Sequence, residues 1–143
     1  MVTSALVEGV AEYLADAGVA EWNPTGGYPP DAAGIFIAAV PASPDRAVTI
    51  TPYPVSIGYG TTDVTVGLQV RTRGTRDPRT LMSLRDAVFT ALDGLSHRVL
   101  SGIHVAQIYW QSGAVLGLDA NERGEHTDNY YVQTAWPSPH RPE

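Results

Sequence analysis

The strongest constraint on the fold is a regular alternation between residues 64 and 71, followed closely by a helix signal. Apolar side chains alternate there with polar or small ones, which is the period-2 pattern of a strand with one buried face. The apolar members are Val64, Val66, Leu68 and Val70. Asp77-Pro78 then predicts the start of a helix, with Asp as N-cap and Pro at the first helical position. Its buried stripe is predicted to be Leu81, Leu84, Val88 and Leu92, and Gly94 to end it.

A second amphipathic helix is predicted over residues 4–17. Thr3 or Ser4 would cap its start, and Gly18 suits the position after its end. Glu8, Glu12 and Asp16 lie on its polar side. The apolar side is formed by Leu6, Val7, Val10, Ala11 and Leu14. A helix with one apolar side has to pack on another element.

The remaining strands and loops follow from shorter signals. Residues 35–40 form a continuous apolar run, so we expect a strand covered on both faces, and residues 47–51 alternate as in a strand covered on one face. Two further strands are predicted at 103–110 and 129–135. Residues 23–34 and 52–63 are rich in Pro and Gly or lack a clear period, and are expected to be long loops.

The resulting order of elements is α-β-β-β-α-β-β. It predicts an α+β fold: a single domain with a mainly antiparallel sheet of about five strands and two helices packed on one face. Residues 1–136 form this domain, and residues 137–143 (PSPHRPE) form a Pro-rich C-terminal tail that cannot continue a strand ladder.

Composition excludes several classes of function. The chain has no Cys, so disulfides and thiolate chemistry are excluded. Its net charge is −6, and all nine basic residues are Arg, which argues against a broad phosphate-binding surface. The N-terminus lacks a basic region and carries acidic residues within its apolar pattern, unlike a signal peptide or membrane span. We expect a soluble intracellular protein.

The stretch LGLDANERGEHTDN (residues 116–129) raises the question of a metal site. An EF-hand frame beginning at Asp119 would place Arg123 where an oxygen ligand is required and Tyr130 where a bidentate Glu should stand. His126 has no second histidine at useful local spacing for zinc. No Gly-x-Ser-x-Gly motif and no phosphate-loop lysine occurs. We therefore predict no catalytic, cofactor-binding or metal-binding residues, and an exposed polar turn that leads into the 129–135 strand.

An arginine-rich stretch, QVRTRGTR (residues 69–76), is the other unusual feature. Alternation places Gln69, Arg71 and Arg73 on the face opposite Val66, Leu68 and Val70. Nucleic-acid binding would need more cations and stacking aromatics. Two interpretations remain: a solvated strand face, or an Arg-rich surface that contacts protein carboxylates.

In this arrangement the chain resembles the tail terminator proteins of long-tailed bacteriophages, sometimes described as minor capsid or head–tail joining proteins. The resemblance rests on four segments in order, of which QVRTRG before a helix and ERGEHTDNYYV are the more specific. The segments are LVEGVAEYLADAG, IFIAAVPASPDRAVTI, VGLQVRTRGTRDPRTLMSLRDAVFTALDGL and LGLDANERGEHTDNYYVQT. Together they cover most of the chain.

The resemblance implies a structural virion protein rather than an enzyme. Such proteins form a ring, expected to be a homohexamer, that caps the tail tube, stops its polymerisation and joins it to the head-closure connector. DNA would pass through without specific binding, no membrane would be involved, and no cofactor is expected. The protein would be made in the bacterial host cytoplasm and located at the head–tail junction of the virion.

A cyclic ring needs two different complementary patches on each subunit. By charge sign alone, Arg71, Arg73 and Arg76 are predicted to supply one patch. The other would consist of Asp119, Glu122, Glu125 and Asp128. Tyr28, Tyr53 and Tyr59 in the two long loops are further candidate interface residues, since Tyr is common at interfaces. For any one of them, covering the domain's own core is the plainer interpretation.

Two other functions stay open. One is another oligomeric head–tail connector or tube component, which would differ in its partner. The other belongs to a different class: a small metal- or ligand-binding enzyme that uses the acidic loop 119–128.

Overall fold

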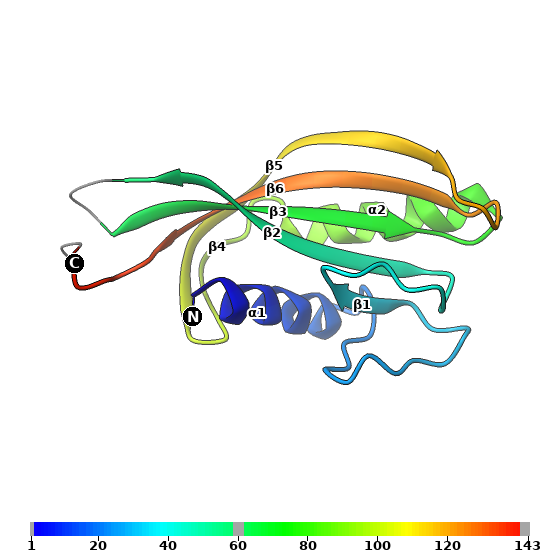
Figure 1. Ribbon diagram of the computed structural model, residues 1–143, viewed down its shortest axis with the longest axis horizontal. Coiled ribbons are helices and arrows are strands. Elements are labelled where there is room, and N and C mark those ends of the chain that lie inside the picture. The colour runs from blue at the N-terminus through cyan, green and yellow to red at the C-terminus, as the bar shows by residue number, and fades with distance from the viewer. Residues whose placement is uncertain (1, 59–61, 141–143) are drawn as a thin grey trace.

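The computed structural model describes residues 2–58 and 62–140 (Figure 1). Its elements are α1 (Val2–Asp16), β1 (Gly34–Ile37), β2 (Ala47–Ile57), β3 (Asp63–Arg73), α2 (Pro78–Leu92), β4 (Ser96–Leu100), β5 (Ile103–Leu118) and β6 (Gly124–Ala135). The six strands form one sheet in the order β1-β2-β3-β6-β5-β4. β1 runs parallel to β2, and every other neighbouring pair is antiparallel. The predicted α+β class and mainly antiparallel sheet are confirmed.

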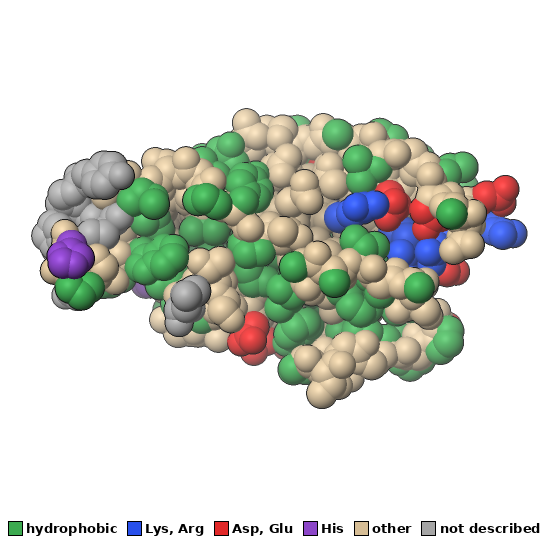
Figure 2. All heavy atoms as spheres, viewed as in Figure 1, with side chains coloured by type: hydrophobic (Ala, Val, Ile, Leu, Met, Phe, Trp, Pro, Cys, Tyr) green, Lys and Arg blue, Asp and Glu red, His purple; other side chains and the backbone are tan. Residues whose placement is uncertain are grey.

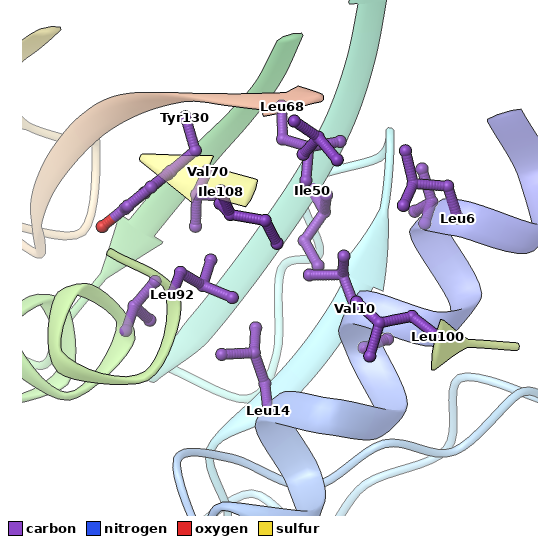
Figure 3. Close-up of a cluster of buried hydrophobic side chains, with 14 of the residues drawn as sticks. Leu6, Val10, Leu14, Ile50, Leu68, Val70, Leu92, Leu100, Ile108 and Tyr130 are labelled. Carbon is purple, nitrogen blue, oxygen red and sulfur yellow. The ribbon is translucent and has the colours of Figure 1, made fainter. Parts of the chain in front are cut away.

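The core lies between the sheet and the two helices, which cover the same face (Figure 1). Alternation in β3 buries Leu68 and Val70 and leaves Gln69 exposed, as the sequence predicts. Leu14 of α1 and Leu92 of α2 approach these strand residues from the two helices (Figure 3). Full burial of one such side chain stabilises the fold by about 1.5–3 kcal/mol. This single layer of contacts therefore fixes the position of both helices.

Local signals at the helix ends are mostly confirmed. The Asp77 carboxylate accepts from the backbone N–H of Arg79 at 3.0 Å, so Asp77 is the N-cap of α2. Gly94 and Gly18 both have positive φ just beyond a helix end, where glycine is favoured. The predicted cap of α1 is wrong: α1 begins at Val2, so Thr3 and Ser4 lie within its first turn.

Several predicted strand limits need correction. Only residues 35–37 of the run 35–40 are strand; they belong to the four-residue edge strand β1, and Ile37 and Val40 are exposed rather than covered on both faces. β2 continues through Pro52 and Pro54, a segment predicted to be a loop. This is possible because β1 pairs with β2 only as far as Ile50, which leaves an edge where proline is tolerated.

The C-terminal half contains more strand than the sequence predicts. β4 was not foreseen, because its sequence SHRVL is short and mostly exposed. β5 extends to Leu118 and β6 starts at Gly124, so the two strands form a long hairpin joined by residues 119–123. The predicted polar turn of residues 116–129 is therefore mostly strand.

Candidate interaction surface

Most of the candidate residues lie at one end of the molecule, where β3 ends and the β5–β6 hairpin turns. We call this region the charged end; it comprises residues 41–45, 71–76 and 119–125. Figure 2 shows acidic and basic side chains gathered at this end. The register of β3 with β6 pairs Arg73 with Glu125 and Arg71 with Thr127, which brings the two candidate groups into one place.

Arg71 and Glu125 form an ion pair within the chain. The guanidinium donates from Nη2 to Oε2 at 2.8 Å and from Nε to Oε1 at 3.2 Å, a bidentate geometry. The side chain of Glu125 is 8% exposed and that of Arg71 is 38% exposed. Both residues belong to the sheet face opposite the helices, so this pair ties β3 to β6 there.

Arg73 is buried and holds a neighbouring segment in place. Its guanidinium donates to the backbone carbonyls of Asp45 (2.8 Å), Pro41 (2.6 Å) and Pro44 (2.7 Å). Burial lowers the pKa of Arg73 from its ordinary value, with nearby Arg123 acting in the same direction. Arg73 therefore acts as a clamp on residues 41–45.

Arg123, which was not among the candidate residues, extends this clamp from the hairpin turn. Its Nη1 donates to the carbonyl of Ala42 at 2.7 Å and to the carboxylate of Asp45 at 3.1 Å. Its Nε donates to Asp119 at 2.8 Å. The sequence showed only a cation in an unsuitable metal frame. Asp119 is a local partner, but Ala42 and Asp45 are 81 and 78 positions away and carry no local signal.

Asp119 shapes the turn between β5 and β6. Its carboxylate accepts from the backbone N–H groups of Asn121 and Arg123, each at 2.9 Å, as well as from the Arg123 side chain. The hydrogen bond from the Arg123 backbone is the largest cause of the lowered pKa of Asp119. Three donors within the chain thus surround this carboxylate.

Arg76 and Glu122 are the most exposed charged residues of the charged end. Their side chains are 75% and 71% exposed, and the distance between Nε and Oε2 is 3.7 Å. A pair this open to water contributes little to stability. These two charges are therefore available for other contacts.

Asp128 lies apart from the charged end, on the face covered by α2. Its carboxylate, 3% exposed, accepts from Nε and Nη2 of Arg85, both at 2.9 Å, and from Nε1 of Trp110 at 2.8 Å. His126 Nδ1 is 3.3 Å away. The carboxylate predicted to lie in an exposed turn is thus a buried anchor between α2 and the sheet. Arg85 and Trp110 were missed, although a cation beside the apolar stripe of a helix is a weak signal for such an anchor.

Tyr28 and Tyr53, the two candidate tyrosines that the structure describes, contact their own domain. Tyr28 Oη accepts from the backbone N–H of Asn23 at 2.8 Å and donates to the carbonyl of Ile35 at 2.7 Å. The ring of Tyr53 covers Gly67, and its hydroxyl bonds with Asn129 Oδ1 at 3.2 Å. Burial is the main cause of the raised pKa of Tyr53. Tyr59 lies outside the described residues. Whether any of the ten candidates contacts a partner stays a prediction.

Within residues 2–58 and 62–140, no three His, Asp or Glu side chains are grouped so that they could hold a metal ion. None of the helices in this part of the chain is long and apolar enough to cross a membrane.

Fold and surface together define a small α+β subunit in which most of the charged candidates bind to their own chain. The same fold occurs in a virion: a chain of the structure described as "Virion of native gene transfer agent (GTA) particle" superposes with a TM-score of 0.62. The two are 13% identical, and the match covers 94% of this chain and 98% of that one. At this identity the similarity shows a common fold.

The model of the family described as "Bacteriophage tail terminator protein" matches residues 13–136. The chain therefore belongs to the bacteriophage tail terminator family, which confirms the resemblance. No curated protein matches the chain. Membership assigns a structural role in tail assembly and a place in the virion tail.

Proposed function

We propose that this protein forms a homohexameric ring that caps the tail tube, stops its polymerisation and offers a joining surface to the head-closure connector. The observation that carries the proposal is the family match over residues 13–136. The shared fold with a virion chain over nearly the whole length of both proteins supports it. The role is structural, without catalysis.

Charge supports the proposed passage of DNA through the ring. The chain carries a net charge of −6, so a lumen lined by several copies would repel phosphates unless the few arginines faced it. Most of the arginines at the charged end are engaged: Arg71 with Glu125, and Arg73 and Arg123 with residues 41–45. DNA could therefore move through such a ring without being held.

Arg76 and Glu122 are the members of the two predicted charge patches that we propose as polar contacts to a neighbour. Both project from the charged end and are mostly exposed. Reversing Arg71 or Arg73 would instead break contacts within the chain. Reversing one charge by Arg76→Glu or by Glu122→Arg should weaken ring assembly. Assembly of both variants equal to that of the wild type in light scattering would exclude these contacts.

Electron microscopy of the purified protein mixed with tail tubes tests the function itself. A ring at one end of each tube is the expected result. Rings stacked along the tube would indicate a tube component, and rings bound only to connectors would indicate a head-side joining protein. A protein that stays monomeric with and without tubes would refute the proposal.

The enzyme alternative is tested by calorimetric titration with calcium, magnesium and zinc. We expect no binding heat, because the Asp119 carboxylate already accepts three hydrogen bonds and Glu125 is paired with Arg71. Stoichiometric binding that Asp119→Asn abolishes would support the alternative.

A further inference from the structure

The exposed large apolar side chains of the described residues fall into two main groups. One group, which we call the β5 edge surface, consists of Met82, Phe89, Trp110, Val115, Leu116 and Leu118. The other group, which we call the β2 edge surface, lies along the outer edge of the sheet: Ile37 and Val40 at and after the end of β1, and Val55 and Ile57 near the end of β2. Val99 in β4 stands alone. The two surfaces belong to opposite sides of the strand order.

Among the described residues, no strand pairs with the outer edge of β5 in the β5 edge surface. β4 pairs with β5 only as far as Gln107. Beyond it, the backbone of Ile108 is hydrogen-bonded to the backbones of Leu95 and Gly94, and the backbone N–H of Trp110 donates to the Asp93 side chain. From residue 111 to 118 the sequence is QSGAVLGL, with no charge and no proline. An edge without charge or proline is open to pairing with another chain. Figure 1 shows this part of β5 along one border of the sheet.

Side chains of α2 continue this edge into a broader apolar surface. Pro78 and Leu81 line a shallow hollow together with Val115 and Leu118. Met82 and Phe89 stand three and four residues from Arg85, which reaches Asp128 beside Trp110. Because residues at these spacings are neighbours on a helix, both exposed apolar side chains of α2 flank the same side as β5.

The size of the β5 edge surface matches one side of a protein interface. Val115 is 77% exposed, Leu118 71% and Met82 60%. Together with Phe89, Trp110 and Leu116, the six residues expose an area equal to that of about three fully exposed large side chains, or roughly 500–600 Å². A standard interface buries about 800 Å² per partner, of which somewhat more than half is nonpolar. A patch of this size is at the upper end of what a typical monomer exposes, and such patches are often functional.

The backbone groups of the β2 edge surface favour pairing with an edge of another kind, one that supplies N–H donors. The carbonyl of Ile50 faces β1, where it accepts from Ala38 N–H at 2.9 Å. Residues two apart in a strand point their backbone groups to the same side, so Pro52 and Pro54 face the same way as Ile50. The part of the β2 edge that β1 does not cover therefore presents carbonyl oxygens, but Pro52 and Pro54 have no N–H to donate there. Two such edges cannot pair well with each other. An edge with free N–H groups, such as β5, can donate to it.

We propose that the β5 edge surface of one copy docks onto the β2 edge surface of a second copy of this chain, in a head-to-tail contact. This inference rests on the proposed ring, because a ring requires two different complementary surfaces on each subunit. It identifies the apolar edges as the main contact, and leaves Arg76 and Glu122 as polar contacts nearby.

The first test is the double variant Val115→Asp/Leu118→Asp, with Val99→Asp as matched control. Val99 is also an exposed strand residue, at 62%, but belongs to neither surface. We expect the double variant to weaken self-association at least tenfold in sedimentation velocity, with an unchanged circular dichroism spectrum. The control should assemble like the wild type. Normal assembly of the double variant would overturn the inference.

A mixing experiment tests the head-to-tail geometry. Ile37→Asp/Ile57→Asp disables the β2 edge surface, so this variant alone should also remain monomeric. An equimolar mixture of the two double variants retains one intact surface of each kind and should form 1:1 heterodimers but no larger species. Failure to form them, or normal assembly by Ile37→Asp/Ile57→Asp, would overturn the inference.

The two proposals fail in different ways. Rings of the Val115→Asp/Leu118→Asp variant on tube ends, seen by electron microscopy, would refute the apolar contact and leave the capping function standing. If the wild type itself stays monomeric with tubes, both proposals are refuted.

Discussion

Removing Arg85 should destabilise the fold more than neutralising its partner Asp128. In Arg85→Met the Asp128 carboxylate, which is 3% exposed in the wild type, loses both hydrogen bonds from Arg85 and keeps Trp110 Nε1 at 2.8 Å, with His126 Nδ1 at 3.3 Å. Breaking a buried pair in this way costs about 3–5 kcal/mol. Because Arg85 is 31% exposed, water already screens part of the interaction. We therefore expect Arg85→Met to lower the free energy of unfolding by about 2–3 kcal/mol. For a chain of this length that lowers Tm by roughly 6–9 °C.

Asp128→Asn should cost less, about 1–2 kcal/mol, because an amide oxygen can still accept from Trp110 and Arg85 can turn to water. Once Asn replaces Asp, no charge is stranded when Arg85 is lost. The double variant should therefore be about 1–2 kcal/mol more stable than the sum of the two single changes predicts.

Urea denaturation followed by circular dichroism measures these differences as shifts in midpoint at constant slope. Arg79→Met is the matched control: it removes an arginine of the same helix that is 85% exposed and pairs with the partly exposed Asp77, and because such a pair contributes little, the midpoint should move much less than in Arg85→Met. If Asp128→Asn is as costly as Arg85→Met, or if the effects add, the reasoning about a stranded carboxylate is wrong.

Four further changes test other parts of the structure. Arg73→Lys should cost about 2–3 kcal/mol in urea denaturation and speed amide exchange in residues 41–45, because one ammonium cannot reproduce three directed bonds to carbonyls; unchanged exchange would contradict the clamp. Gly9→Ala should destabilise by about 1–3 kcal/mol although helix propensity alone favours Ala by about 1, since its Cβ would lie 2.7 Å from the backbone carbon of Leu100; a higher Tm would contradict this. Tyr130→Phe should be close to neutral at pH 7, because the buried Tyr130 hydroxyl has no partner among the described residues. Burial raises the pKa of Tyr130, so the unfolded state ionises first and the wild type loses stability as pH rises above about 10, more than Tyr130→Phe does; equal losses would count against it. The pKa of Asp119 is lowered, so its contribution is present above about pH 4 and is lost as pH falls further, and Asp119→Asn should flatten the acid limb of the stability curve.

Local signals predicted the parts of the fold that local chemistry determines. The alternation of β3 and the Asp77-Pro78 start of α2 depend on neighbours a few residues away, and both are confirmed. β5 was predicted only to Trp110. Two of its three bulges lie beyond that residue, between Trp110 and Ser112 and between Val115 and Gly117. Each bulge shifts the period-2 pattern by one residue, so the alternation disappears although pairing with β6 continues.

The sequence identified the charged residues, but it could not show whether their partners belong to the same chain or to another one. Arg71 and Glu125 are 54 positions apart and meet only because Arg73 is opposite Glu125 in the register of β3 with β6. Before that register is known, opposite charges fit a contact within one subunit as well as a contact between two. The sign of a charge therefore says little about assembly until the ion pairs formed within one chain are known and left out of consideration. Arg76 and Glu122 are the most exposed charges of the charged end, and the large apolar side chains of the two edge surfaces are 37–77% exposed. Because exposed ion pairs contribute little and buried apolar area contributes most to association, the edges are the better guide to how copies of this chain meet.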